Sequence, residues 1–210
     1  MKVLLVNGSP KKEGSTFAAL SIVAEELAAN GVETEIFQLA NQQGIEGCRG
    51  CGYCFKNDGC VIGDIVNEFV EKAYEADGFI FGTPVHFAGA SGALTSFLNR
   101  VFYSNYKTKA AFRGKPGSAI AVCRRGGSSA TLDQINRYFG ITGMPTVPSQ
   151  YWNMIHGNSP AEVAQDLEGV QILQILAKNM AWLMRCIEAG KSAGIELPPL
   201  ERVKPTNFIR

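Results

Sequence analysis

The sequence predicts an α/β protein in which one parallel sheet of five strands is covered by helices on both faces. Apolar strand patterns and amphipathic helix patterns alternate along most of the chain, which is typical of parallel strands joined by helical crossovers. The length of 210 residues suits one domain, and 46% hydrophobic residues suffice for a packed core. No internal repeat or low-complexity linker divides the chain, so we expect a single domain over residues 1–210.

Five segments have the composition of strands. The first is a short apolar run directly after Met1, and the second alternates as a half-buried strand does. The third, GFIFG, is wholly apolar, as a central parallel strand would be. The predicted strands are residues 2–6, 32–39, 78–82, 117–123 and 144–147.

Four helix patterns lie between or after these strands. Asn30 and Gly31 end the first in the manner of a C-cap, and Asp64 is a candidate N-cap for the second. Each pattern has apolar residues at helical spacing. The positions are Leu20, Val23 and Leu27; Val66, Phe69, Val70 and Ala73; Leu94, Phe97, Leu98, Val101 and Phe102; and Leu132, Ile135 and Phe139.

A longer helix is predicted at about residues 160–190. Ser159 and Glu162 form a capping box, with Pro160 at the first helical position. The helix carries two apolar stripes, although a surface helix needs only one to cover a sheet. We therefore expect it to contribute to oligomerisation, as a homodimer or homotetramer. A fully buried core helix and a helix with an apolar outer face are the alternatives.

Charge and hydropathy exclude several classes of protein. Twenty basic and nineteen acidic residues give a net charge of +1, which predicts neither nucleic-acid binding nor attachment to an anionic membrane. The first apolar run is too short for a signal peptide, and no segment approaches the roughly 20 apolar residues of a membrane helix. We expect a cytoplasmic protein.

The loop after the first strand, NGSPKKEGST, has the features of a phosphate site. It joins a strand to a helix N-terminus, where free N–H groups and the helix dipole attract anions, and it offers hydroxyls at Ser9, Ser15 and Thr16. It lacks the Walker A pattern and the GxGxxG pattern, so nucleoside triphosphate hydrolysis and ordinary dinucleotide binding are disfavoured. A plain turn with a Ser or Thr cap is the alternative.

Two further loops follow strands and would lie at the same edge of the sheet. In GTPVHFAGASG, a proline, aromatic-type side chains and glycines suit a planar ligand, and His86 is either a hydrogen-bonding or proton-relay group or a packing residue. In RRGGSS, Arg124 and Arg125 could neutralise phosphates, unless they form a solvated basic turn. A phosphate on one loop and a flat ring between the others fit FMN best.

Together, NGSPKKEGST, GTPVHFAGASG, RRGG and QYWNMIHG resemble the flavodoxin-like NADPH-dependent FMN reductase family, over residues 1 to about 157. The resemblance implies a three-layer αβα sandwich with strand order 2-1-3-4-5. It also implies that the FMN phosphate lies on one set of residues and the isoalloxazine on another. The phosphate set is Ser9, Lys11, Ser15 and Thr16, and the ring set is Pro84, Val85, His86, Phe87, Gly126 and Gly127.

The segment CRGCGYCFKNDGC holds four of the six cysteines, Cys48, Cys51, Cys54 and Cys60. The other two, Cys123 and Cys186, fall on strand and helix patterns and are expected in the core. The spacing C-x2-C-x2-C-x5-C lets thiolates converge on one face of a compact loop, as in iron–sulfur sites. Zinc, free thiols and a regulatory disulfide are the alternatives, although zinc sites usually divide their cysteines into two separated pairs. The resemblance to the iron–sulfur flavoprotein branch implies a [4Fe–4S] cluster, and we expect the loop to lie near the flavin.

The function expected from these features is an FMN-dependent oxidoreductase that passes electrons from NAD(P)H through bound FMN to a small-molecule or protein acceptor. The protein would hold and tune the flavin, while the cofactor supplies the hydride chemistry. The sequence singles out no catalytic acid or base. The rival functions are an iron–sulfur flavoprotein that exchanges electrons with ferredoxin-like partners, and a flavin-free regulatory or scaffolding domain.

Overall fold

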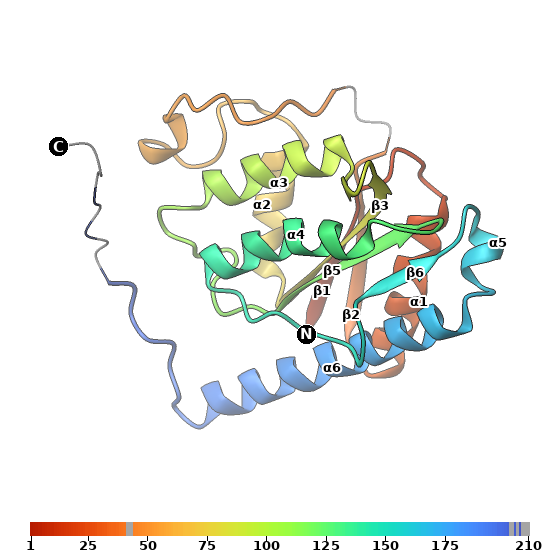
Figure 1. The fold of residues 1–210 in the computed structure, drawn as a ribbon. Helices are drawn as coiled ribbons and strands as arrows, with labels where there is room; N and C mark the ends of the chain where they lie inside the picture. The colour runs from red at the N-terminus through yellow and green to blue at the C-terminus, as the bar shows by residue number, and fades with distance from the viewer. Residues whose placement is uncertain (41–43, 202–203, 205, 207–210) are drawn as a thin grey trace.

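The computed structural model describes residues 1–40, 44–201, 204 and 206, and its sheet confirms the predicted fold class (Figure 1). Five strands form a parallel sheet in the order β2-β1-β3-β5-β6, which is the expected order 2-1-3-4-5. The two-residue β4 pairs with the end of β3 as an antiparallel hairpin. The strands are β1 (Lys2–Asn7), β2 (Glu33–Gln38), β3 (Gly78–His86), β4 (Gly89–Ala90), β5 (Gly117–Cys123) and β6 (Met154–His156).

The helices form one layer on each face of the sheet (Figure 1). Helices α1 and α6 cover one face, and α2, α3 and α4 cover the other. No helix in the described part of the chain is both long and apolar enough to cross a membrane. The helices are α1 (Ser15–Ala29), the 3₁₀ helix η1 (Tyr53–Phe55), α2 (Ile65–Glu75), α3 (Gly92–Ser104), α4 (Ser128–Thr142), α5 (Pro160–Val163) and α6 (Leu167–Ser192).

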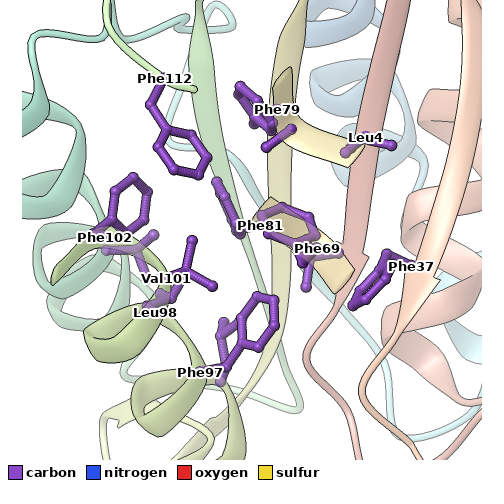
Figure 2. Close-up of a cluster of buried hydrophobic side chains, with 14 of the residues drawn as sticks. Leu4, Phe37, Phe69, Phe79, Phe81, Phe97, Leu98, Val101, Phe102 and Phe112 are labelled. Carbon is purple, nitrogen blue, oxygen red and sulfur yellow. The ribbon is translucent and has the colours of Figure 1, made fainter. Parts of the chain in front are cut away.

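Alternation along the central strands divides the core in two. In β1, Val3 and Leu5 face the α1–α6 layer, whereas Leu4 and Val6 face the α2–α4 layer. The second of these cores is rich in phenylalanine, and Phe69 of α2 lies at its centre (Figure 2). Its fully buried ring lies within 6.5 Å, between centroids, of the rings of Phe37, Phe79, Phe81, Phe97 and Phe112.

The fifth strand of the sheet is not where the sequence predicted it. Residues 144–147 form only an isolated bridge to β5 at Thr146, and the fifth strand is β6, at Met154–His156. Pro145 and Pro148 explain the error. A proline nitrogen cannot donate to a strand ladder, so pairing is limited to the bonds made by Gly117 N–H and Val147 N–H.

The predicted long helix is interrupted. The capping box at Ser159 opens only the four-residue α5, and α6 begins separately after Asp166. Asp166 caps α6 by accepting from Gly169 N–H (3.0 Å), and its other oxygen accepts from His156 N–H (2.7 Å) and lies 3.1 Å from His156 Nδ1. The apolar stripe that faces the core is buried, but Cys186, which we expected in the core, is exposed.

Replacing Asp166 with alanine is expected to destabilise the protein by about 2 kcal/mol, because one substitution removes a helix cap and the acceptor that fixes the end of β6. Burial opposes ionisation of this carboxyl, but the bonds from Gly169 and His156 outweigh it and lower its pKa. The stabilisation is therefore present above the unfolded pKa of about 3.9 and is lost as pH falls through the lower folded value. Urea unfolding at several pH values measures both effects. An equal loss in Asp166→Asn, which retains one acceptor, would contradict the capping role.

The outer strands of the sheet are short or charged. Strand β6 has three residues, and the opposite edge, β2, carries Glu33 and Glu35. Glu35 bridges Lys2 (2.7 Å) and Lys72 (2.9 Å), and these hydrogen-bonded ammonium groups lower its pKa. The pairs are partly exposed, so they contribute little to stability.

Candidate functional site

A groove of about 280 Å³ opens at the carboxyl ends of β1, β3, β5 and β6, where ligands bind to sheets of this kind. We call it the rim groove. Its lining includes the cations Lys11 and Arg124 and, among the described residues, no carboxylate. The groove therefore favours an anionic ligand. Its lining residues are Ser9, Pro10, Lys11, Ser15, Thr16, Pro84, Val85, His86, Val122, Cys123, Arg124, Gly157 and Asn158.

The loop after β1 is held in place by Asn7, whose side chain is fully buried. Its amide nitrogen donates to the carbonyl of Lys12 (3.2 Å) and to the side-chain oxygen of Gln38 (2.8 Å), and its oxygen accepts from Ser9 N–H (3.1 Å). Ser9 Oγ in turn accepts from Lys11 N–H (3.1 Å). These hydrogen bonds fix the conformation of the loop that leads into the N-terminus of α1.

Helix α1 starts at this loop without a side-chain cap. Its N-cap is Gly14, which has no side chain to accept from the first-turn N–H groups. Ser15 and Thr16 stand at the first two helical positions and line the groove. The dipole and the free donors of the first turn therefore point to where an anion such as a phosphate would bind.

The β3–β4 hairpin forms the opposite wall. Ser91 ties it to the first loop, because its hydroxyl donates to the carbonyl of Gly8 (2.6 Å) and its N–H donates to Thr83 Oγ1 (3.0 Å). The two tip residues, Phe87 and Ala88, both have positive φ, at 50° and 58°. The ring of Phe87 is fully exposed and lies outside the groove.

The loop after β5 packs against this hairpin through Gly127. Gly127 has φ +90°, and a Cβ added there would lie 2.9 Å from both Ala88 Cα and Val85 Cγ1. Any side chain would displace the hairpin. Gly126 has no such limit, since a Cβ added there would meet nothing within 4 Å.

The substitution Gly127→Ala is expected to destabilise the protein by about 2 kcal/mol, from the left-handed backbone and the forced hairpin shift, and to weaken ligand binding in the rim groove. Gly126→Ala is the matched control and should be neutral. Chemical denaturation and FMN titration of both variants test this. Equal behaviour of the two variants would show that the hairpin does not depend on this contact.

The structure brings together most of the ligand residues that the sequence predicts, and their roles in binding FMN stay predictions. Three of them do not line the groove: Phe87, Gly126 and Gly127. Of these, Gly127 still supports the groove wall, because it packs closely against Val85 and Ala88 of the hairpin. Five lining residues were missed: Pro10, Val122, Cys123, Gly157 and Asn158. Eight predicted residues line it: Ser9, Lys11, Ser15, Thr16, Pro84, Val85, His86 and Arg124.

The four loop cysteines line a second, small pocket of about 20 Å³, which we call the cysteine pocket. Gly50, Gly52 and Gly59 all have positive φ, so glycines produce the turns that wrap the loop. The pKa of Cys54 is raised, chiefly by burial and to a lesser extent by the charges of Cys48, Cys60 and Cys51. The set Cys48, Cys51, Cys54 and Cys60 thus has the donor chemistry of an iron–sulfur site, with four thiols on one pocket.

The thiols are not arranged as a finished metal site. In the described residues, no three His, Cys, Asp or Glu side chains are grouped closely enough to hold a metal ion. The pocket is also separate from the rim groove. Cys60 contacts Arg100 of α3, which at about 1.5 Å per residue lies roughly 13 Å along the helix from Ser91 at the groove end. The cysteine pocket and the rim groove share no lining residue, and the expectation that the cysteine loop lies near the flavin stays a prediction.

Comparison with known proteins identifies the family of this chain. The sequence model of the family described as NADPH-dependent FMN reductase matches residues 1–159. The chain belongs to this family. An iron–sulfur flavoprotein of Methanocaldococcus jannaschii is 33% identical to this chain over 195 residues. The match covers 90% of this chain and 100% of that relative. This chain therefore falls in the iron–sulfur flavoprotein branch of the family.

Solved structures agree on the fold of this FMN reductase family member. An NADH:FMN oxidoreductase superposes with a TM-score of 0.64 at 16% identity, covering 87% of this chain and 89% of that one. A flavodoxin from the domain Archaea gives 0.59 at 14% identity, covering 88% and 99%. At these identities the likeness shows the flavodoxin-like fold alone. The family assignment makes the protein a flavin-dependent oxidoreductase with FMN as its cofactor.

Proposed function

We propose that the protein oxidises NAD(P)H and passes the electrons through FMN bound in the rim groove to a small-molecule or protein acceptor. The observation that carries the proposal is the convergence, on one groove, of an uncapped helix N-terminus, two cationic side chains and the wall formed by Pro84 and Val85. An anion site beside a flat apolar wall matches a phosphorylated ring system.

The residues of the groove have separate tasks in this proposal. The phosphate binds the first turn of α1 and its hydroxyls, and Lys11 and Arg124 supply opposite charge. Pro84, Val85 and His86 hold the isoalloxazine. When bound, FMN supplies hydride transfer with the nicotinamide donor. The groove volume of about 280 Å³ is small for a ligand of the size of FMN, since small-molecule sites commonly measure about 300–1,000 Å³. Part of the ring would remain accessible to the donor and the acceptor.

The test is anaerobic reconstitution with FMN followed by addition of NADPH or NADH. Rapid loss of the absorbance of oxidised flavin, with turnover of an added acceptor, is the expected result. Protein that binds FMN but is bleached only by reduced ferredoxin would rule out the nicotinamide donor. Protein that refuses FMN altogether would instead support the flavin-free alternative.

The cysteine pocket favours a second candidate function, an electron carrier that exchanges electrons with ferredoxin-like partners. Cys48, Cys51, Cys54 and Cys60 would hold a [4Fe–4S] cluster, in keeping with the likeness to the iron–sulfur flavoprotein of Methanocaldococcus jannaschii. Iron and sulfide assays after anaerobic purification test this site. Zinc without sulfide, or four alkylatable thiols without metal, would favour the other interpretations of the loop.

We also propose that two copies associate, in a cytoplasmic homodimer or in the first step to a tetramer. Four large apolar side chains near β6 and on α6 are more than half exposed, and a contact between copies would cover them. They are Tyr151, Trp152, Leu167 and Trp182. Light scattering on Trp182→Glu against the unchanged protein tests this proposal, because a charged residue in a covered apolar face should shift the mass toward the monomer.

A further inference from the structure

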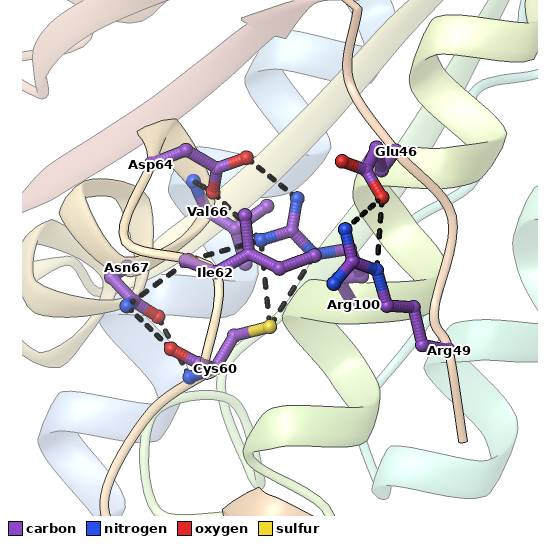
Figure 3. A network of polar contacts seen from close by, with 8 residues as sticks. All are labelled: Glu46, Arg49, Cys60, Ile62, Asp64, Val66, Asn67 and Arg100. Atoms are coloured by element: carbon purple, nitrogen blue, oxygen red, sulfur yellow. Dashed lines mark hydrogen bonds and ion pairs between the residues drawn. The ribbon is translucent and has the colours of Figure 1, made fainter. Parts of the chain in front are cut away.

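One buried arginine is aimed into the cysteine pocket from α3. The side chain of Arg100 is only 1% exposed, although its charge is expensive to remove from water. Figure 3 shows its contacts with Cys60, Ile62 and Asp64. Its Nε and Nη2 each lie 3.4 Å from Cys60 Sγ. Nη1 and Nη2 also donate to the two carboxylate oxygens of Asp64, at 2.7 and 2.8 Å, and Nη2 donates to the carbonyl of Ile62 at 3.1 Å.

All of these contacts fall on one short stretch, residues 60–64, which leads from the last loop cysteine into α2. The bidentate pair with Asp64 fixes the plane of the guanidinium, because both N–H groups on that side are committed to the carboxylate. Asn67 fixes the backbone of the same stretch by accepting from Cys60 N–H (2.8 Å) and donating to its carbonyl (2.9 Å). The sulfur of Cys60 is therefore held, whereas Cys48 and Cys51 are exposed.

A neutral thiol is a weak hydrogen-bond acceptor and does not offset the cost of burying a guanidinium beside it. An anionic sulfur does, since charge-assisted bonds are about twice as strong as neutral ones. A thiolate bound to iron keeps part of its negative charge, and hydrogen bonds to such sulfurs are one of the factors that set the potential of a cluster. The arrangement around Cys60 thus suits a metal-bound thiolate better than a free thiol.

We propose that Arg100 is a positioning residue of the cysteine pocket. Arg100 orients the thiolate of Cys60 as a ligand and stabilises the reduced form of an iron–sulfur cluster held in the pocket. This inference rests on the proposed cluster. Reduction adds one electron, and hence negative charge, to the cluster, and a fixed cation at its ligand favours that state. Arg100 therefore raises the reduction potential of the cluster.

The experiment compares anaerobically reconstituted protein with three variants. Arg100→Met removes the charge and the donors at similar length, and Arg100→Lys keeps the charge but loses the planar fork. Arg49→Met is the matched control. Arg49 belongs to the same loop and lines the same pocket, but it is largely exposed and pairs with Glu46 (2.6 Å). Iron and sulfide per chain, the cluster potential from a dithionite titration followed by electron paramagnetic resonance, and FMN occupancy are measured for each.

We expect Arg100→Met to shift the reduction equilibrium toward the oxidised cluster by about tenfold, which is about 59 mV for one electron. Arg100→Lys should fall between Arg100→Met and the unchanged protein. Arg49→Met should shift the equilibrium much less than Arg100→Met does, because solvent screens the exposed charge of Arg49. If Arg100→Met fails to fold, as loss of FMN would show, Arg100→Lys decides. A potential and iron content in Arg100→Lys equal to those of the unchanged protein would overturn the positioning role. Unchanged protein that takes up no iron or sulfide would instead refute the cluster itself, and the inference with it.

Discussion

Replacing Ser15 with glutamate is expected to weaken FMN binding by at least about 100-fold while leaving the FMN-free protein folded and slightly more stable. A carboxylate at the first position of α1 interacts favourably with the helix dipole, which is worth about 0.3–1 kcal/mol. The same carboxylate occupies the place proposed for the FMN phosphate and repels it. A 100-fold loss of affinity corresponds to about 2.7 kcal/mol of binding free energy. Repulsion between a carboxylate and a phosphate in a partly buried groove is large enough to account for it.

The opposite signs of the two effects make this prediction specific. Ser21→Glu is the matched control, because it places the same charge on the same helix about 9 Å from its N-terminus. It should leave FMN affinity close to that of the unchanged protein. Isothermal titration with FMN and thermal unfolding of the FMN-free proteins give the two readouts. Tight FMN binding by Ser15→Glu would show that the phosphate does not lie at this helix, and the proposed site would have to be abandoned.

Replacing Phe69 with alanine is expected to cost about 3–5 kcal/mol of unfolding free energy, the largest stability effect that we predict. Its ring has no solvent exposure and lies at the centre of the aromatic core of the α2–α4 layer, 5.1 Å from both Phe37 and Phe97 between centroids. Its removal leaves a cavity that these rings, held by β2 and α3, cannot collapse to fill. Since domains are commonly stable by only about 5–15 kcal/mol, the loss is a large fraction of the total.

Phe87→Ala tests whether this cost comes from burial. The substitution is the same, but the ring of Phe87 is fully exposed at the tip of the β3–β4 hairpin. We expect it to change the free energy of unfolding by less than about 0.5 kcal/mol. Chemical denaturation of both variants without FMN provides the comparison. A loss below about 1 kcal/mol in Phe69→Ala would mean that the core repacks around the missing ring, contrary to the rigidity inferred here.

Much of the fold could be predicted from the sequence, because local patterns and tertiary structure agree through β5. The order of elements, the N-cap at Asp64 and the layered sheet follow from hydrophobic periodicity and connection rules. The prediction failed at the last strand. Residues 144–147 include the apolar Met144 and Val147 and follow a helix, but two prolines prevent a full ladder. Strand β6, Met154–His156, is too short to give a periodic signal. Only pairing with β5 makes it a strand.

That one error also explains two of the five residues that were missed in the candidate site. Gly157 and Asn158 line the rim groove because they directly follow β6, just as the other site loops follow their own strands. A correct strand assignment would have placed them at the groove by the same rule. Cys123 was read only as a core residue, and it is both buried and at the groove floor. The buried Arg100 behind Cys60 had no sequence signal, since a contact across forty positions depends on tertiary packing.

The two outer strands limit how copies of this protein can meet. A sheet grows across molecules only when an unpaired strand offers a long, flat row of backbone donors and acceptors. Strand β6 is too brief to offer such a row, and β2 presents the exposed carboxylate of Glu33, which would face its own copy and repel it. Association through a continuous intermolecular sheet, including fibril growth from the native state, is therefore disfavoured at both ends. Any stable assembly has to be formed by helix faces and loops.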